Sequence, residues 1–246
     1  MRRPASRAAP LCGFALLFLA GCASVAPPAI VGGAGPVALV ALRSNDDINW
    51  EGEDETQDSK AADWVRGLFV KDDSLVTKSS AAGILAEADA LIREHMASPG
   101  VTFVDRDAVL NAPAYQTAPE QSALFRQHTL SAEGYRFVWY RGAGFDAERC
   151  AALCAETGAG ALLFVDLAFT KAMTSGFGKN GQCRARVIMS LVALDAAGKV
   201  IFRRGYEERS YNRAAVKGGA YAPGALSDLC REALITACAR FARQAQ

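Results

Sequence analysis

The residues with the clearest capacity for metal chemistry lie in an acidic segment, residues 46–58. Oxygen-bearing side chains recur there at alternate positions and a glycine follows them, which is the spacing of a calcium-binding loop. The matching positions are Asp47, Asn49, Glu51, Gly52 and Asp58. Glu51 stands where such a loop has Asp or Asn, and Asp58 is shorter than the usual bidentate glutamate. We therefore predict a solvated acidic loop with no bound metal, and the alternative is a calcium site built from Asp47, Asn49, Glu51 and Asp58.

A basic stretch around a glycine-rich turn is the second candidate site. Between Leu167 and Leu194 there is no acidic residue, and the basic residues are Lys171, Lys179, Arg184 and Arg186. Asn180-Gly181 is a favoured hairpin pair, and Phe177 stands between two glycines just before it. An exposed ring flanked by cations can anchor to an anionic protein surface or to lipid headgroups. Phe177, Lys179, Arg184 and Arg186 are therefore candidates for an interaction tip, and the sequence leaves open the other interpretation, a solvated turn whose charges only aid solubility.

Residues suited to catalysis are sparse. The chain has two histidines, His95 and His128, and neither stands beside a serine or cysteine in a nucleophile motif such as G-x-S-x-G. We therefore predict no enzymatic activity and no cofactor. A hydrolase whose site is assembled from the irregular segment 107–145 is the alternative.

Five cysteines follow residue 22, and their spacing favours a structural role. They are Cys150, Cys154, Cys183, Cys230 and Cys238. The close-spaced C-x-x-C and H-x-x-x-H pairs of zinc sites do not occur in the sequence. Four of the cysteines fall on apolar faces of expected helices, which is typical of small buried core residues. An inter-helix disulfide is the alternative that the sequence leaves open.

The N-terminus has the layout of an export signal. Residues 2–7 carry three arginines and no acid, and residues 11–21 form an apolar run that ends in small residues,. This run has 11 residues, whereas a membrane-spanning helix needs about 20. Leu19-Ala20-Gly21-Cys22 resembles the lipobox of bacterial lipoproteins. The resemblance implies that residues 1–21 are removed and that Cys22 becomes a diacylated N-terminus, which anchors the chain in a lipid bilayer.

The residues after Cys22 set how the anchored protein is placed. Residues 23–36 are small, uncharged and rich in Pro and Gly, so residues 22–36 are predicted to form a lipidated tether that reaches about 45 Å when stretched. Ala23 follows the cysteine, and in the lipoprotein family pattern a residue other than aspartate favours the outer membrane. We predict a lipid-anchored cell-envelope protein that faces the periplasm or the surface, on the outer rather than the inner membrane.

The overall charge argues against nucleic acid as a partner. Removing residues 1–21 takes away three arginines and leaves 24 basic against 26 acidic residues, a net charge of −2. A chain without excess positive charge has no electrostatic basis for general nucleic-acid binding.

Hydrophobic patterning predicts the elements that position these sites. We expect a buried strand at residues 37–42, a helix with apolar positions from Ile84 to Met96, a strand from Val101 and a short strand at 135–140. A helix capped by Asp146, three consecutive antiparallel strands and a last helix from about Pro223 follow. This order predicts one α/β (α+β) domain, residues 37–246, with a single mixed β-sheet of about five strands. Parallel crossovers come first and an antiparallel meander follows, with helices packed on the faces of the sheet.

Three segments of this pattern resemble a known group of envelope domains. They are "VTFVDRDAVL", "TGAGALLFVDL" and "VALDAAGKVIF", and they resemble the α/β domains of curli-assembly lipoproteins, of penicillin-binding-protein-activator lipoproteins and of the N-terminal module of the Tol-system propeller protein. The resemblance implies a non-enzymatic module that binds or assembles other envelope proteins. The alternatives are a cation-responsive ligand-binding lipoprotein that uses the loop 46–58, or an envelope hydrolase.

Overall fold

The computed structural model describes residues 35–51, 75–98, 100–122, 126–141, 144–177 and 179–245. The signal segment, Cys22 and most of the tether lie outside the described residues, as do residues 52–58 of the acidic loop. In the described part of the chain, no helix is long and apolar enough to cross a membrane.

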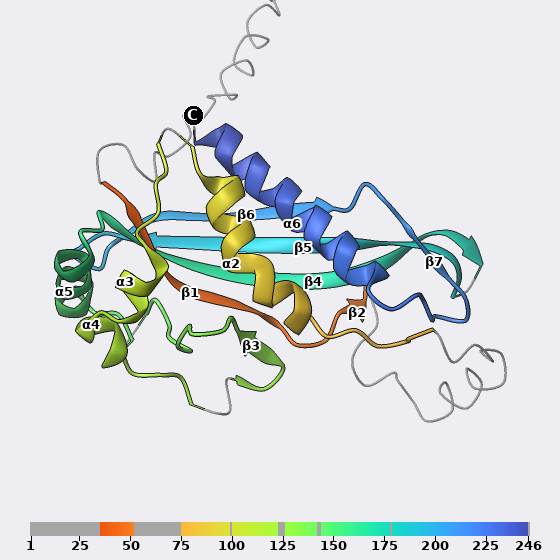
Figure 1. Ribbon diagram of the computed structural model, residues 1–246, viewed down its shortest axis with the longest axis horizontal. Helices are drawn as coiled ribbons and strands as arrows, with labels where there is room; N and C mark the ends of the chain where they lie inside the picture. Colours follow the sequence, from red (N-terminus) through yellow and green to blue (C-terminus); the bar gives the residue numbers. More distant parts are fainter. Residues whose placement is uncertain are drawn as a thin grey trace, which may run out of the picture.

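A single mixed sheet forms the centre of the molecule (Figure 1). Its main strands are β1 (Val37–Asn45), β3 (Thr129–Ser131), β4 (Ala161–Phe177), β5 (Asn180–Leu194) and β6 (Val200–Arg209), in the order β3-β1-β4-β5-β6. β1 and β4 are parallel, and β4, β5 and β6 form an antiparallel meander. Short strands β2 (Asn49–Trp50) and β7 (Ala214–Val216) pair with β4 and β5. The predicted fold class, an α/β fold with one mixed sheet, is confirmed.

Two long helices cover one face of the sheet. These are α2 (Ala82–Met96) and α6 (Ala225–Gln244), which lie together in front of the strands in Figure 1. Arg231 of α6 donates two hydrogen bonds to Glu87 of α2, at 2.8 and 2.7 Å. The ring of Phe241 meets the rings of Phe202 and Tyr206 on β6 edge to face. The apolar stripe of each helix is therefore buried against the sheet, as its 3.6-residue period requires.

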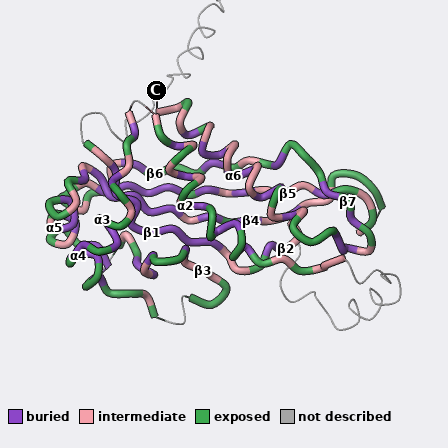
Figure 2. Tube along the Cα trace, in the orientation of Figure 1, coloured by how far each residue is buried: buried purple, intermediate pink, exposed green. Residues whose placement is uncertain are grey.

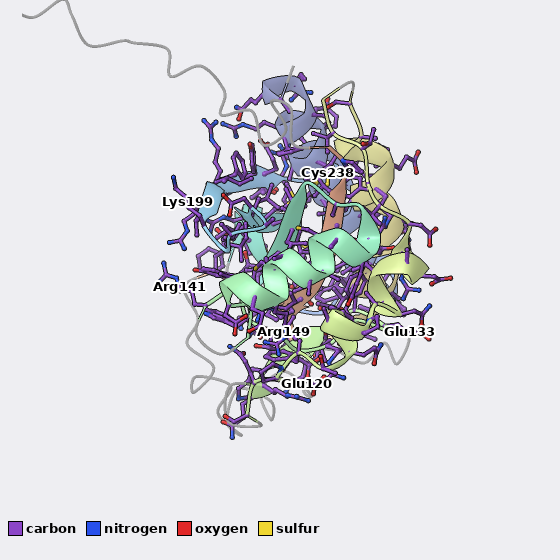
Figure 3. The ribbon with its side chains drawn as sticks, turned by 90° about the vertical axis from the view of Figure 1, so that its left-hand side faces the viewer. Glu120, Glu133, Arg141, Arg149, Lys199 and Cys238 are labelled. Atoms are coloured by element: carbon purple, nitrogen blue, oxygen red, sulfur yellow. The ribbon has the colours of Figure 1, made fainter. Side chains whose placement is uncertain are left out.

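Three shorter helices lie toward the end of the sheet where β1 and β4 begin. They are α3 (Arg106–Leu110), α4 (Pro113–Gln116) and α5 (Ala147–Thr157), and Figure 3 looks onto this end, with α5 lying across it. The carboxylate of Asp146 accepts a hydrogen bond from the backbone N–H of Arg149, and Gly158 ends α5 in the left-handed conformation. The start of this helix at Asp146 was predicted from the sequence.

Two predicted strands are wrong. The segment from Val101 makes two isolated bridges, Phe103 with Val37 and Val101 with Ser98, and no strand, because Asp105 caps α3 two residues after Phe103 and stops the extended chain. Residues 135–140 form no strand, and their aromatic side chains pack over the sheet instead. The strand that pairs with the outer edge of β1 is β3, which the sequence did not indicate.

All five cysteines after residue 22 are free and buried. Cys238 on α6 lies against Met189 on β5, with 3.9 Å between the two sulfur atoms. Burial raises the pKa of Cys230 and Cys238 to about 12. The interpretation of these cysteines as small core residues is confirmed, and the inter-helix disulfide is not formed.

Candidate functional site

The tip of the β4–β5 hairpin presents one aromatic ring to solvent. Phe177 is 92% exposed, and Figure 2 shows the surrounding end of the hairpin as exposed. Gly176 and Gly181 face each other across the hairpin with φ of 116° and 148°. A Cβ at either glycine would collide with the backbone of the opposite strand. The two glycines therefore let β4 and β5 approach closely at the end of the hairpin, and Phe177 follows Gly176 as the last residue of β4.

A second turn braces the tip. The backbone N–H of Gly219 donates to the carbonyl of Lys179 at 2.8 Å, and the N–H of Gly218 donates to Asn180 Oδ1 at 2.8 Å. The side chain of Lys179 runs beside Gly219, and Lys217 opens this second turn, residues 217–220, with an exposed side chain. Two lysines thus lie on adjoining turns at the same end of the molecule as Phe177.

A cavity of about 430 Å³ lies behind the second turn. Its wall is largely alanine and leucine, contributed by β7, the chain that follows it and the start of α6. The charged residues that line it are Arg213, Lys217 and Asp228. This end of the molecule therefore combines an exposed ring, cations and an adjoining apolar hollow.

Arg184 and Arg186 share the sheet face that α2 and α6 leave uncovered, but Arg186 is neutralised. Its Nη2 lies 2.7 Å from Glu207 on β6, and its Nη1 lies 3.3 Å from Glu51. The hydrogen bond from Arg186 lowers the pKa of Glu207. Arg209 also contacts Glu51, at 3.2 Å. The hairpin has no acidic residue of its own, but Glu51 and Glu207 from neighbouring strand segments pair with Arg186. The net positive charge around the hairpin is therefore smaller than its sequence suggests.

Lys171 does not belong to the tip. It is 3% exposed and lies on the helix-covered side of the sheet. Its ammonium group is 5.1 Å from the ring centre of Trp50 and 5.0 Å from that of Tyr221, and it donates to Tyr221 Oη at 3.1 Å. Aromatic faces and a hydroxyl thus solvate this cation inside the protein.

The described residues of the acidic segment, 46–51, are bound to other parts of the protein. The backbone of Asp47 forms an isolated antiparallel β-bridge with Ser80, and Asn49 lies in β2 opposite Thr170 of β4. Glu51 is bound by two arginines, and a neutralised carboxylate is a poor ligand for calcium. Asp58 lies outside the described residues. Among the residues that the structure describes, there is no group of three or more His, Cys, Asp or Glu side chains that could hold a metal ion.

The sequence analysis missed an arginine buried between two aromatic rings. Arg43 on β1 is 2% exposed. Its guanidinium carbon lies 4.6 Å from the ring centre of Trp139 and 5.4 Å from that of Phe137, and its Nη1 donates to the Val138 carbonyl at 3.3 Å. Its Nη2 lies 2.6 Å from Asp166 Oδ1 on β4. These contacts attach the segment 137–139 to the open face of the sheet.

One sequence signal could have found this cluster. Each of two strongly apolar strands, "VALVALR" and "LLFVDL", contains a single charged residue, and the two charges are opposite. Burial raises the pKa of Asp166, and the adjacent guanidinium of Arg43 opposes that rise. The ion pair thus links β1 to β4 beside the two rings that enclose Arg43.

Comparison with models of known protein families finds no match for this chain. Comparison with curated protein sequences finds none either.

Proposed function

We propose that the protein is a membrane-anchored cell-envelope lipoprotein that acts as a non-enzymatic protein-binding or assembly module, with the β4–β5 hairpin end as its contact surface. The observation that carries the proposal is the 92% exposure of Phe177 at the end of an ordered hairpin. Burying a phenylalanine side chain contributes about 1.5–3 kcal/mol. Buried aromatic anchors of this kind dominate the energy of many protein interfaces.

Charge at this end specifies the chemistry of the partner. Lys179 and Lys217 lie on the two turns that hydrogen bond to each other, and Arg213 lines the adjoining cavity with Lys217. A partner that fits offers an apolar pocket for the Phe177 ring, surrounded by carboxylates. Complementary charges of this kind speed association and select the partner.

The position of the tip favours a protein over the bilayer that holds the anchor. Val37 pairs with Ala161 at the start of β4, and Phe177 ends that strand. β4 has 17 residues, so these two ends lie roughly 50 Å apart at about 3.3 Å per residue. Figure 1 shows β1 beginning at one end of the molecule and the hairpin tip at the other. A tether that enters at Val37 thus leaves the tip free to point away from its own membrane.

Site-specific crosslinking in native cells tests the proposal. A photoreactive residue at position 177 is expected to capture a discrete protein partner, and the same residue at position 200 serves as the control. Val200 is also exposed, at 40%, but it begins β6 at the other end of the molecule. Equal capture of the same protein from both positions, or capture of lipid alone from position 177, would contradict the proposed function.

A further inference from the structure

β6 is an open edge of the sheet. The strand order ends with β6, and in the described part of the chain β6 pairs with β5 along its length and with no other strand. The strand has 10 residues. An edge strand of this length presents a row of backbone N–H and C=O groups to which another strand can add.

The charges along β6 are of both signs. In order they are Arg203, Arg204, Glu207, Glu208 and Arg209. Charged side chains on an edge usually keep other chains away. Here the alternation of sign lets the strand complement a second copy of itself.

Two-fold symmetry restricts how two copies of β6 can pair. An axis perpendicular to the sheet makes the strands antiparallel and keeps each side chain on its own face, so one residue must lie on the axis opposite itself. With Gly205 on the axis, Arg203 lies opposite Glu207 of the second copy, and the same contact occurs twice. No like charges then face each other.

Other registers of the two β6 strands are less favourable than the one centred on Gly205. Those centred on Arg203, Arg204 or Glu207 set two like charges against each other on the axis, and like charges directly opposite are destabilising. The register centred on Tyr206 sets Arg203 opposite Arg209 of the second copy, again twice. Registers centred nearer the strand ends pair only a short part of β6.

The surroundings of Gly205 and Glu207 suit the same register. A Cβ added to Gly205 would meet no atom within 4 Å, so a side chain placed at this position has room on the face of the sheet. Glu207 already receives Arg186 at 2.7 Å, and Arg186 contacts Glu51 at 3.3 Å. Arg203 of a second copy would extend this row of alternating charges across the new strand pair.

We propose that β6 is a homodimer interface, in which two copies of this chain join their sheets antiparallel with Gly205 on the two-fold axis. The interface leaves the hairpin tip of each copy free, because the tip is formed by β4 and β5. The inference is independent of the proposed function.

Cysteine crosslinking of the full chain in intact cells tests this interface. Directly opposite residues of an antiparallel pair have Cα atoms about 4.5–5.5 Å apart, which is within the range of a disulfide. Gly205→Cys is therefore expected to give a covalent dimer on mild oxidation. Ser190→Cys is the matched control, because Ser190 is exposed on the same face and pairs with Gly205 inside the sheet. It is expected to remain monomeric.

The register is tested by mixing single variants. Arg203→Cys with Glu207→Cys is expected to crosslink between copies, and Arg203→Cys with Arg209→Cys is not. Charge reversal by Arg203→Glu is expected to lower the dimer fraction of the solubilised protein in analytical ultracentrifugation, and adding Glu207→Arg is expected to restore it. Absence of a Gly205→Cys dimer from the folded protein, or equal dimerisation of Ser190→Cys, overturns the proposal.

Discussion

Arg43 Nη2 lies 2.6 Å from Asp166 Oδ1, yet the two side chains are unequally exposed, at 2% and 39%. Removing Asp166 should therefore change the free energy of unfolding by a different amount from removing Arg43. A buried charge left without its partner is strongly destabilising, whereas a carboxylate that reaches water can be solvated.

We expect Asp166→Ala to lower the free energy of unfolding by about 3 kcal/mol, because it leaves the Arg43 guanidinium buried and uncompensated. Arg43→Met should cost less, about 1–2 kcal/mol, since it loses the aromatic contacts and leaves Asp166 partly solvated. Urea unfolding of both variants and of the double variant measures the order and the coupling. A larger loss for Arg43→Met than for Asp166→Ala would show that stacking on Trp139 and Phe137 outweighs the ion pair.

Substitutions at the hairpin tip should affect partner binding without affecting stability. Phe177→Ala combined with Lys179→Glu should leave the melting temperature nearly unchanged, since the Phe177 ring is exposed. Association with the partner captured from position 177 should weaken at least tenfold, and added salt should weaken it further because exposed charges are screened beyond about 8 Å at physiological ionic strength. Tyr211→Ala is the matched control, as Tyr211 is also highly exposed, at 83%, but lies outside the hairpin. If the double variant binds the partner as the parent does, up to the same salt concentration, the tip is a solvated turn and not a contact surface.

The anchor is tested at Cys22. If Cys22 is the lipidation site that we propose, Cys22→Ser should give an uncleaved or soluble precursor that incorporates no labelled fatty acid, because the variant lacks the sulfur to be acylated. Fractionation and metabolic labelling with palmitate measure both effects. A Cys22→Ser protein that still carries label and partitions with membranes would refute the lipoprotein assignment.

Alkaline pH should destabilise the fold through its buried thiols. Burial raises the pKa of Cys150, Cys230 and Cys238 from 9.0 to about 12. Above about pH 9 the unfolded chain loses these protons while the folded chain keeps them, so stability falls as pH rises toward 12. Each such group contributes a loss of about 1.4 kcal/mol per pH unit once it titrates only in the unfolded chain.

Urea unfolding from pH 8 to pH 10 measures this slope. The Cys238→Ala variant should be less stable throughout because of the cavity that it leaves, but its stability should fall less steeply with pH. A flat profile up to pH 10 in the parent protein would contradict the burial of these thiols.

The sequence alone determined the main elements and the fold class. The apolar period of α2 and α6, the Asp146 cap of α5 and the alternation along β5 are local patterns, and each specifies its element without distant contacts,. The hairpin itself was also predicted, but the pair expected as its turn, Asn180-Gly181, instead begins β5 and pairs with Phe177 and Gly176 of β4. The predictions for residues 52–58 and for Cys22 rest on sequence alone, since these residues lie outside the described part of the chain.

Tertiary structure decided what the charged and aromatic residues do. Lys171, Arg184 and Arg186 look alike in sequence, but Lys171 is enclosed by Trp50 and Tyr221, and Arg186 meets a glutamate 135 positions away. The aromatic segment 135–140 has strand-like composition, but its rings enclose Arg43 from 95 positions away. A charge is exposed, paired or buried according to the segments that fold against it, and no local pattern carries that information.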